Sequence, residues 1–471
     1  MKRIIGRNAE MKQLTEYAAS GKAEFVVIFG RRRVGKTFLV KEFFRGNFTF
    51  YLSGAENASK KEQLFNFTTA LNKHSKAEYP PVDSWQNAFV QLESYLQSVK
   101  TNGRKVVFID ELPWLDNAKS GFLLAFEYFW NAYASSESGI LLIVCGSATS
   151  WLMNKIIRNR GGLHNRVTRQ IFLEPFTLNE TEQFLKSKKI AMTRFQIAEC
   201  YMIMGGIPYY LEQLERSLGL DQNIDKLFFK KNAVLRNEYS KLYASLFKKP
   251  ENYIKIIEVL AQKRKGLTRE EIVKFSRISD GGGLTDMLEE LELCGFISIN
   301  SNFTNSKKNQ LHQLVDFYSL FYLNFVKDRK GNDASYWSSL IDNPVHRSWT
   351  GYSFELLCQT HISQIKKALS IGGVISYLSG WRSKESADGA QIDLLIDRND
   401  NIINICEMKY STKEFTITKA IDANLRNKRG AFIEETKTRK TTHITMITTY
   451  GVKHNEYWNN IQSEVKLDDL F

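Results

Sequence analysis

The sequence predicts an α/β fold divided among several domains, and three observations support this prediction. The chain has 471 residues, 43% of them hydrophobic, so it can bury large cores and should divide into about two to four units. Near the N-terminus, apolar runs of strand length alternate with helical patterns, as they do around a parallel sheet. Towards the C-terminus, two apolar runs flank the polar turn 397–401, and this pattern predicts a β-hairpin.

The first element is the segment EFVVIFGRRRVGKTFLVKEFF, which begins at Glu24. It contains an apolar strand over 25–29, then the spacing Gly30-x-x-x-x-Gly35-Lys36-Thr37, then an amphipathic helix, and this order defines a P-loop. The glycines let backbone N–H groups face a phosphate, Lys36 reaches its oxygens, and the Thr37 hydroxyl binds Mg²⁺. An accidental glycine-rich turn is the alternative. We therefore expect ATP and Mg²⁺ to bind at the loop residues Gly30, Arg31, Arg32, Arg33, Val34, Gly35, Lys36 and Thr37.

A pair of carboxylates follows the next buried strand. Residues 106–109 of the segment RKVVFIDELPWLD form an apolar run that ends at Asp110 and Glu111. Asp110 would hold the metal through water. Glu111 would accept a proton from the attacking water, which predicts hydrolysis and not transfer to a bound acceptor. The alternative is a solvated pair of acids at a strand end.

Two further positions are candidates for sensing the γ-phosphate. Ser147 follows the apolar run GILLIVC and Gly146, where its hydroxyl would face that phosphate, although capping a helix is an equally ordinary role. Arg166 and Arg169 lie in the loop before a strand expected at 170–173. An arginine there would stabilise the charge of the transition state, and a surface arginine is the alternative. If Arg166 acts across a subunit boundary, the protein works as a homo-oligomer.

Six segments together resemble a known family. They are IIGRNAEMKQL, the P-loop, the Asp110–Glu111 strand, CGSATSWL, NRVTRQIFLEPF and GGIPYYL. They are similar to the archaeal-type ATPase family within the AAA+/STAND group of P-loop NTPases, over residues 1 to about 240. The resemblance implies an ASCE-type parallel sheet over 1–195 and a small helical lid over 196–245. Pro208 would mark the hinge region of the lid, or would simply start a helix.

The middle of the chain has the spacing of a winged helix. Residues 253–303 read as three helices followed by a strand, within a winged-helix-like module at 246–310 and before a helical connector at 311–344. The third helix carries acids that would repel phosphate: Asp286, Glu289, Glu290 and Glu292. The basic residues lie elsewhere, at Lys263, Arg264, Lys265, Lys307 and Lys308. The module would therefore contact DNA away from that helix, or serve as a spacer or a protein-contact module.

The last domain, expected at 345–471, gathers acids and a lysine. Glu355 lies on a predicted helix, Asp393 opens one strand of the hairpin, and Glu407 and Lys409 close the next. Because side chains alternate along a strand, Glu407 and Lys409 project from one face, which can also receive Asp393. The carboxylates of Asp393 and Glu407 offer the oxygen ligands that Mg²⁺ prefers, and Lys409 would position or activate water.

This spacing resembles the PD-(D/E)xK nuclease superfamily, with Glu355 as its first-helix acid and Ile392 in place of the proline. The pairing with an ATPase is similar to the ATPase family's C-terminal region of unknown function, over roughly 310–471, including the closing KLDDLF. The resemblance implies a nuclease-like fold. The alternatives are an inactivated nuclease fold that binds DNA, or a strand pair with an ordinary salt bridge. Six cations downstream would neutralise a phosphate backbone or form a solvated face: Arg426, Lys428, Arg429, Lys437, Arg439 and Lys440.

The whole composition agrees with a partner that is acidic. The formal charge of +14 favours an acidic partner such as nucleic acid or an anionic membrane surface, and simple solubility is the alternative. The five scattered cysteines predict buried thiols in a reducing compartment, and the absence of a long apolar run predicts a cytoplasmic protein without a membrane span. We therefore expect ATP hydrolysis coupled to DNA binding or processing, with metal-dependent cleavage at the C-terminal site. The alternative is a nucleotide-controlled switch or scaffold whose C-terminal domain binds DNA or protein without cleavage.

Overall fold

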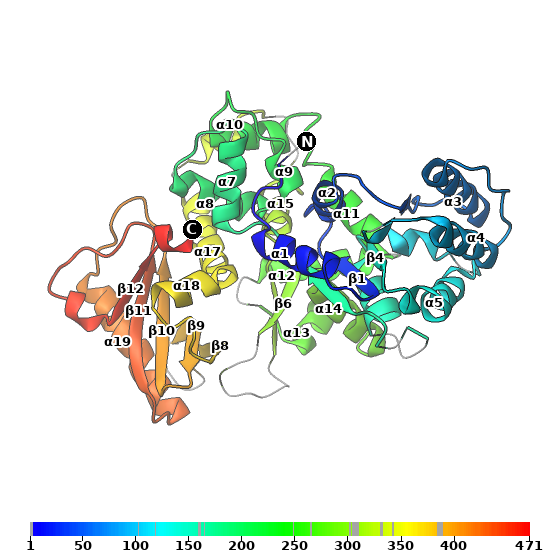
Figure 1. Ribbon diagram of the computed structural model, residues 1–471. Helices are drawn as coiled ribbons and strands as arrows, with labels where there is room; N and C mark the ends of the chain where they lie inside the picture. Colours follow the sequence, from blue (N-terminus) through cyan, green and yellow to red (C-terminus); the bar gives the residue numbers. More distant parts are fainter. Residues whose placement is uncertain are drawn as a thin grey trace. The chain divides into compact units, whose positions relative to one another are not determined.

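The computed structural model describes residues 3–101, 103–117, 119–158, 162–163, 165–247, 249–263, 266–300, 303, 310–329, 333–341, 343–383 and 390–471 (Figure 1). They form two compact units. The first contains Met1–Pro175 with Ala244–Lys248, and the second contains Phe176–Tyr243 with Lys249–Phe471. Residues 176–195, which we assigned to the ATPase core from the sequence, thus pack with the second unit.

The first unit is built on the expected parallel sheet. Its strands lie in the order β2-β3-β4-β1-β5 and every neighbouring pair is parallel. The strands are β1 (Glu24–Phe29), β2 (Phe50–Ser53), β3 (Lys105–Asp110), β4 (Ile140–Cys145) and β5 (Arg169–Phe172). All six residues of β1 and of β4 are buried, as a sheet covered on both faces requires.

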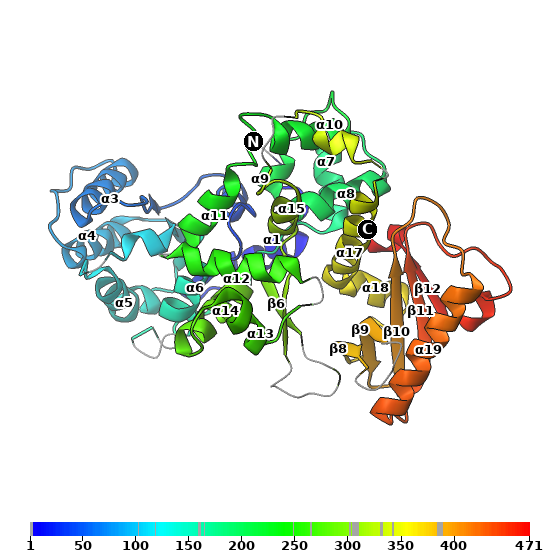
Figure 2. The same cartoon turned by 180° about the vertical axis from the view of Figure 1, so that it is seen from behind.

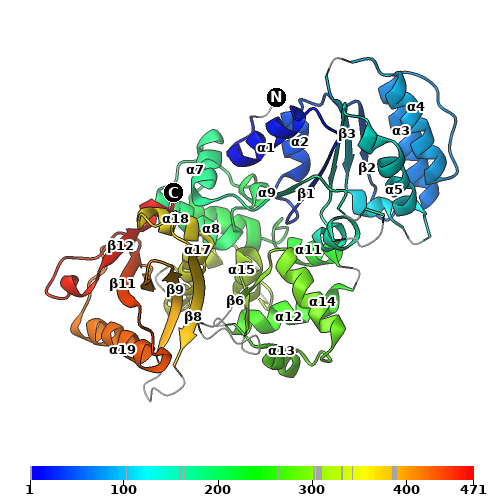
Figure 3. The same ribbon diagram turned by 60° about the horizontal axis from the view of Figure 1, so that its bottom comes forward.

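Helices cover both faces of this sheet, as Figure 3 shows. Phe50 of β2 packs on Phe67 of α3, and its neighbour Tyr51 points the other way, under Lys41 of α2. The helices of the first unit are α1 (Asn8–Ala18), α2 (Lys36–Phe43), α3 (Lys60–Ser75), α4 (Trp85–Ser98), α5 (Phe122–Ala132) and α6 (Thr149–Leu152). The two faces of β2 thus contact different helices, α3 on one side and α2 on the other. The loop 30–35 lies between the end of β1 at Phe29 and the start of α2 at Lys36.

The second unit begins with the helices predicted as a lid. They are α7 (Leu178–Ser187), α8 (Arg194–Met204), α9 (Pro208–Leu211) and α10 (Leu220–Ile224), followed by α11 (Glu238–Leu246), which continues into the residues of the first unit. α8 ends at Gly205 and Gly206, both with positive φ, and a Cβ on Gly206 would lie 2.3 Å from the carbonyl oxygen of Phe176. Pro208 is the first residue of α9, so it starts a helix there.

The three helices and strand predicted for the middle of the chain are present (Figure 2). α12 (Pro250–Gln262), α13 (Arg269–Ser276) and α14 (Gly282–Leu293) precede an antiparallel hairpin of β6 (Ile297–Asn300) and β7 (Leu311–Leu314). Thr268 and Glu271 form a capping box at α13. Four predicted cations, Arg264, Lys265, Lys307 and Lys308, lie outside the described residues.

The helices of the connector, residues 311–344, contribute to an aromatic core. α15 (Phe317–Phe325) and α16 (Tyr336–Ser339) bring Phe321 and Phe325 against Trp337 and Trp349, with ring centroids 5.0–5.5 Å apart. These rings are buried, so they stabilise the fold by their contacts with one another.

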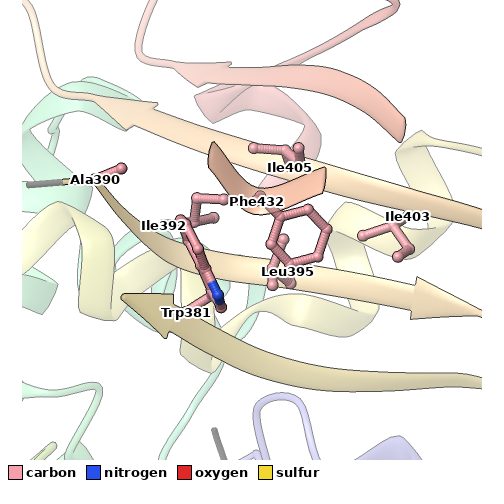
Figure 4. Close-up of a cluster of buried hydrophobic side chains, with 7 residues drawn as sticks. All are labelled: Trp381, Ala390, Ile392, Leu395, Ile403, Ile405 and Phe432. Atoms are coloured by element: carbon pink, nitrogen blue, oxygen red, sulfur yellow. The ribbon is translucent and has the colours of Figure 1, made fainter. Parts of the chain in front are cut away.

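The C-terminal domain contains a mixed sheet in the order β12-β11-β10-β9-β8. The predicted hairpin is confirmed, because β9 pairs antiparallel with both β8 and β10, whereas β10, β11 and β12 are parallel. Its elements are α17 (Pro344–Thr360), α18 (Ile362–Ala368), β8 (Ser376–Arg382), β9 (Gln391–Arg398), β10 (Ile402–Lys409), α19 (Lys419–Thr436), β11 (Thr441–Thr448) and β12 (Ser463–Lys466). Figure 4 shows the core between this sheet and α19, where Phe432 meets Trp381, Ile392, Leu395 and Ile405.

Helices α7 and α8 are joined to the C-terminal domain. The backbone N–H of Leu178 donates to Nε2 of the buried His361 at 3.0 Å, and the Phe195 ring stacks on Tyr410 and Tyr450 at 5.0 and 5.8 Å. Arg194 pairs with Asp468 of the closing segment at 3.2 Å. Burial lowers the pKa of His361 to about 4, so the ring stays neutral and accepts the bond.

All five cysteines are buried and unpaired, as predicted from their scatter. Among the helices that the structure describes, none combines the length and the apolar character that crossing a bilayer demands.

Candidate functional site

The loop between β1 and α2 has the conformation of a phosphate-binding loop. Gly30 has φ 139° and Gly35 has φ 96°, values that favour glycine. A Cβ on Gly30 would also lie 2.3 Å from the carbonyl oxygen of Leu173, whereas a Cβ on Gly35 would meet no atom within 4 Å. A larger residue at position 30 would therefore collide with Leu173. At position 35 a side chain would meet no atom, but the positive φ favours glycine.

Lys36 and Thr37 lie where the sequence predicts the phosphate and metal contacts. The Lys36 ammonium is buried and donates to the carbonyl oxygens of Gly30 and Arg31 at 2.8 and 2.9 Å. The Thr37 hydroxyl donates to Oδ1 of Asp110 at 3.0 Å, so the loop and the end of β3 are in direct contact. An ammonium beside a helix N-terminus suits phosphate oxygens, and a hydroxyl with a carboxylate suits Mg²⁺.

A residue of the N-terminal motif also supports the loop. Arg7 is buried, and its guanidinium donates to the carbonyl oxygen of Val34 at 3.1 Å. The sequence identified its segment only through resemblance and gave Arg7 no role. The residues around Arg7 are partly or fully exposed, so the burial of this one cation could not be predicted from the sequence. Of the other loop residues, Arg31 is buried, and Arg32 and Arg33 are half-buried.

Glu111 and Ser147 contact each other. The backbone N–H and the hydroxyl of Ser147 both donate to Oε2 of Glu111 at 2.9 Å. Burial raises the pKa of Glu111, although these bonds and Lys36 act in the opposite direction. The helix-cap alternative for Ser147 is wrong, because α6 has Ala148 at its N-cap and no side chain caps it. The predicted contact of Ser147 with a γ-phosphate stays a prediction.

The two arginines before β5 differ. Arg169 lies 3.5 Å from the buried Glu24 and covers the ring of Tyr17, so it stabilises the edge of the sheet. Arg166 is exposed on a turn whose backbone N–H donates to Leu163, and within the described part of the chain its side chain makes no hydrogen bond or ion pair. The structure does not connect Arg166 to Glu111 or the P-loop, and its role stays a prediction.

The second site lies at one end of the C-terminal sheet. Glu355 of α17, Asp393 of β9, and Glu407 and Lys409 of β10 line one cleft of about 910 Å³. The register pairs Leu394 with Cys406, so Asp393 and Glu407 lie one step beyond the last pair, on adjacent strands. The four predicted residues are therefore brought together by a helix and two strands.

Lys428 of α19 enters the same cleft. Its ammonium lies 2.7 Å from Oε2 of Glu407, and that of Lys409 lies 2.8 Å from Oε1. The sequence placed Lys428 among six phosphate-neutralising cations without separating it from the others. The helical spacing of Lys428 with the core residues Leu425 and Phe432 is the signal that it points towards the sheet.

The other five cations lie apart from this contact. Arg426 pairs with Asp422, Arg429 donates to the Thr442 hydroxyl, and Lys440 pairs with Asp397. Lys437 and Arg439 are exposed. Three of these cations thus make separate local contacts, and neutralisation of a phosphate backbone by the six stays a prediction.

The charges in this cleft perturb one another. Burial, together with the charges of Asp393 and Glu407, raises the pKa of Glu355 to about 8, so this acid is largely protonated at neutral pH. Burial alone would raise the pKa of Glu407, but Lys428 and Lys409 outweigh it and lower that pKa. Burial alone would lower the pKa of Lys409, but the charge and the hydrogen bond of Glu407 raise the pKa of this lysine.

The cleft has the oxygen ligands of a divalent-ion site but not its arrangement. Both carboxylate oxygens of Glu407 contact lysines, and Oδ1 of Asp393 accepts from Gln391 at 2.5 Å. Among the described residues, no group of three or more His, Cys, Asp or Glu side chains is placed to hold a metal ion. A divalent ion would first have to displace an ammonium from Glu407.

Comparison with known proteins identifies the class of the first unit. Residues 4–214 match the model of a family described as an ATPase domain predominantly from Archaea. Together with the loop and the parallel sheet, this match defines an ATPase-type P-loop domain. It includes none of residues 215–471, for which the resemblance to nucleases stays a prediction.

Two similar proteins come from archaea. The uncharacterized protein MJECL04 of Methanocaldococcus jannaschii is 25% identical over 433 residues, which cover 90% of this chain and 91% of the relative. The uncharacterized ATP-binding protein PYRAB12000 of Pyrococcus abyssi is 25% identical over 233 residues, 45% of this chain and 70% of the relative. Among solved structures, the Walker-type ATPase PABY2304 of Pyrococcus abyssi has a TM-score of 0.49 at 16% identity, covering 68% of this chain and 96% of that one.

Proposed function

We propose that the first unit hydrolyses ATP with Mg²⁺. The observation that carries this proposal is Glu111, which directly follows the Asp110 carboxylate that binds Thr37. Bound Mg²⁺ supplies positive charge to the phosphates. Lys36 and the loop would hold the phosphates, Asp110 and Thr37 would hold the ion, and Glu111, once released by Ser147, would accept the proton of the attacking water. Burial raises the pKa of Glu111, which makes its carboxylate a stronger base.

Phosphate release from ATP by the purified full chain tests this proposal. We expect turnover with Mg²⁺ and none in Lys36→Ala. Lys22→Ala is the matched control, because it removes an exposed lysine of the same unit away from the loop. Equal rates in Lys36→Ala and Lys22→Ala would contradict the assignment.

We propose further that ATP hydrolysis is coupled to the binding or processing of DNA by the C-terminal domain. Glu355, Asp393, Glu407 and Lys409 in one cleft support this proposal, together with the net charge of +14. Incubation of single-stranded, duplex and branched DNA with Mg²⁺ or Mn²⁺, with and without ATP, tests for cleavage. Nicking should disappear in the Asp393→Asn, Glu407→Gln double variant, whereas Lys36→Ala should lose only its dependence on ATP.

A second candidate function is a nucleotide-controlled switch that binds DNA or protein without cutting. The ion pairs of Lys409 and Lys428 with Glu407 favour it, because they already neutralise the acid that cleavage requires. It predicts that no metal elicits cleavage, while replacement of ATP by ADP changes DNA affinity. Cleavage that depends on Glu407 would exclude this candidate.

A further inference from the structure

The cleft at the C-terminal site has a second wall that belongs to the middle of the chain. The β6–β7 hairpin and the start of α13 line it together with α17, α19 and the ends of β8, β9 and β10. Asn300 and Gln313 of the hairpin lie in the same cleft as Glu355 and Asp393. The acids therefore do not open onto a flat surface but face a groove with two sides.

Phe303 attaches this hairpin to the C-terminal sheet. Its backbone N–H donates to the carbonyl oxygen of Gly380 at 3.3 Å. Its ring packs edge-on against Phe432 at 5.0 Å and joins the core that contains Trp381. Gly380 and Trp381 themselves line the cleft, so this contact lies beside it.

Five of the polar side chains that line the cleft are amides, and they lie among charged groups of both signs. Asn300 and Gln313 on the hairpin face Gln359, Gln391 and Asn424 on the other elements. An amide offers a donor and an acceptor together, which suits the edges of nucleic-acid bases. Asn300 donates to Gln313 at 3.1 Å and Gln391 donates to Asp393 at 2.5 Å, and a bound base would exchange these bonds for its own. Arg347 and Arg382 add positive groups that suit a phosphate backbone, whereas Lys409 and Lys428 are paired with Glu407.

We infer that this cleft receives an unpaired strand of nucleic acid between the β6–β7 hairpin and the end of the C-terminal sheet. The inference rests on the proposed role of this site in DNA binding. In a duplex the Watson–Crick edges are already paired, whereas an unpaired strand presents them to protein amides. A cleft of about 910 Å³ with lining residues on two sides offers space for a few nucleotides of one strand and less space for the two strands of a duplex.

Binding measured by fluorescence anisotropy tests this inference. The full chain is mixed, in EDTA and without nucleotide, with a labelled single-stranded DNA of about 12 nucleotides or its duplex, a length within the usual site size of a single-strand groove. We expect the single strand to bind at least about tenfold more tightly than the duplex. The Asn300→Ala, Gln313→Ala double variant should lose about tenfold in affinity for the single strand, since one good pair of base contacts contributes that much.

A charge-matched pair of variants provides the control. Arg382→Gln removes a guanidinium from the cleft, and Arg277→Gln removes one exposed at the end of α13, outside it. Only Arg382→Gln should weaken single-strand binding. If the double variant unfolds, photo-cross-linking of the same DNA to the wild-type chain replaces it, with cross-links expected in β7 and α17.

Three outcomes would overturn the inference. These are equal or tighter binding of the duplex, equal effects of Arg382→Gln and Arg277→Gln, and cross-links confined to residues outside the cleft. The binding assay contains neither metal nor ATP, so its result does not depend on cleavage or hydrolysis. A failure of either proposed activity can therefore be distinguished from a failure of this inference. Absence of any DNA binding would overturn both this inference and the proposed role in DNA binding, but not ATP hydrolysis.

Discussion

The P-loop and the C-terminal cleft both combine lysines with carboxylates, yet the partners differ. Lys36 donates to two backbone carbonyls, and Asp110 accepts from the Thr37 hydroxyl. Lys409 and Lys428 instead contact the two oxygens of one acid, Glu407. The first arrangement places the ammonium on two neutral carbonyl groups of the loop, whereas the second pairs two ammonium groups with one carboxylate. The comparison teaches that residue types alone do not separate a site prepared for an anion from a balanced network.

Replacing Glu111 should give the largest effect. Glu111→Gln preserves the size of the side chain but removes the base, so we expect ATP hydrolysis to fall by about 100-fold or more. ATP affinity, measured with a fluorescent nucleotide, should stay close to that of the wild type. Lys36→Ala should instead lose the affinity itself. A Glu111→Gln variant that hydrolyses ATP at the wild-type rate would remove the distinction between the two residues.

Arg166 tests whether the P-loop site is completed by another subunit. If the exposed guanidinium acts on the γ-phosphate of a neighbour, Arg166→Ala should reduce hydrolysis by about tenfold or more. Mixing Arg166→Ala with Lys36→Ala should then recover part of the activity, because some interfaces pair an intact arginine with an intact loop. An unchanged rate in Arg166→Ala alone would rule out the role.

Removing Lys428 should perturb the balanced site. Lys428→Met leaves Glu407 with one cationic partner, and we expect the melting temperature of the full chain to fall by several degrees. Mn²⁺ should raise the melting temperature of this variant more than that of the wild type, since an oxygen of Glu407 becomes available. Arg426→Met is the matched control on α19, because the Arg426 side chain is 65% exposed and its ion pair should contribute little. Equal metal responses in wild type and Lys428→Met would show that Lys428 does not compete with a cation.

Glu355 gives the smallest expected effect, through pH. Its pKa is about 8 in the folded chain against an ordinary value of 4.5, so between these values the folded state binds more protons than the unfolded state. Stability from this group is therefore lost as pH rises from about 4.5 to 8. The melting temperature of Glu355→Gln should fall less than that of the wild type over this range. Parallel profiles would mean that Glu355 does not retain its proton.

The local motifs were predictable because short segments carry them. Strand, loop and helix around Gly30–Thr37 are contiguous, and so are β9, the turn and β10 with Asp393 and Glu407. The sequence could not separate Lys428 from its five basic neighbours, since its contact depends on how α19 packs on the sheet. It also could not show that Ser147 binds Glu111 or that Phe303 packs on Phe432, because these pairs are distant in sequence and depend on tertiary packing.

The hydrogen bond from Leu178 to His361 bears on how the chain can be shortened. A truncation before Pro344 would leave the first N–H of α7 without its buried acceptor and expose the ring of Phe195 that stacks on Tyr410. The helices that the sequence assigns to the ATPase would then present an apolar surface to solvent, and such a fragment should aggregate. Acidification below about pH 4 should have a related effect in the intact chain, because a protonated imidazole cannot accept that bond.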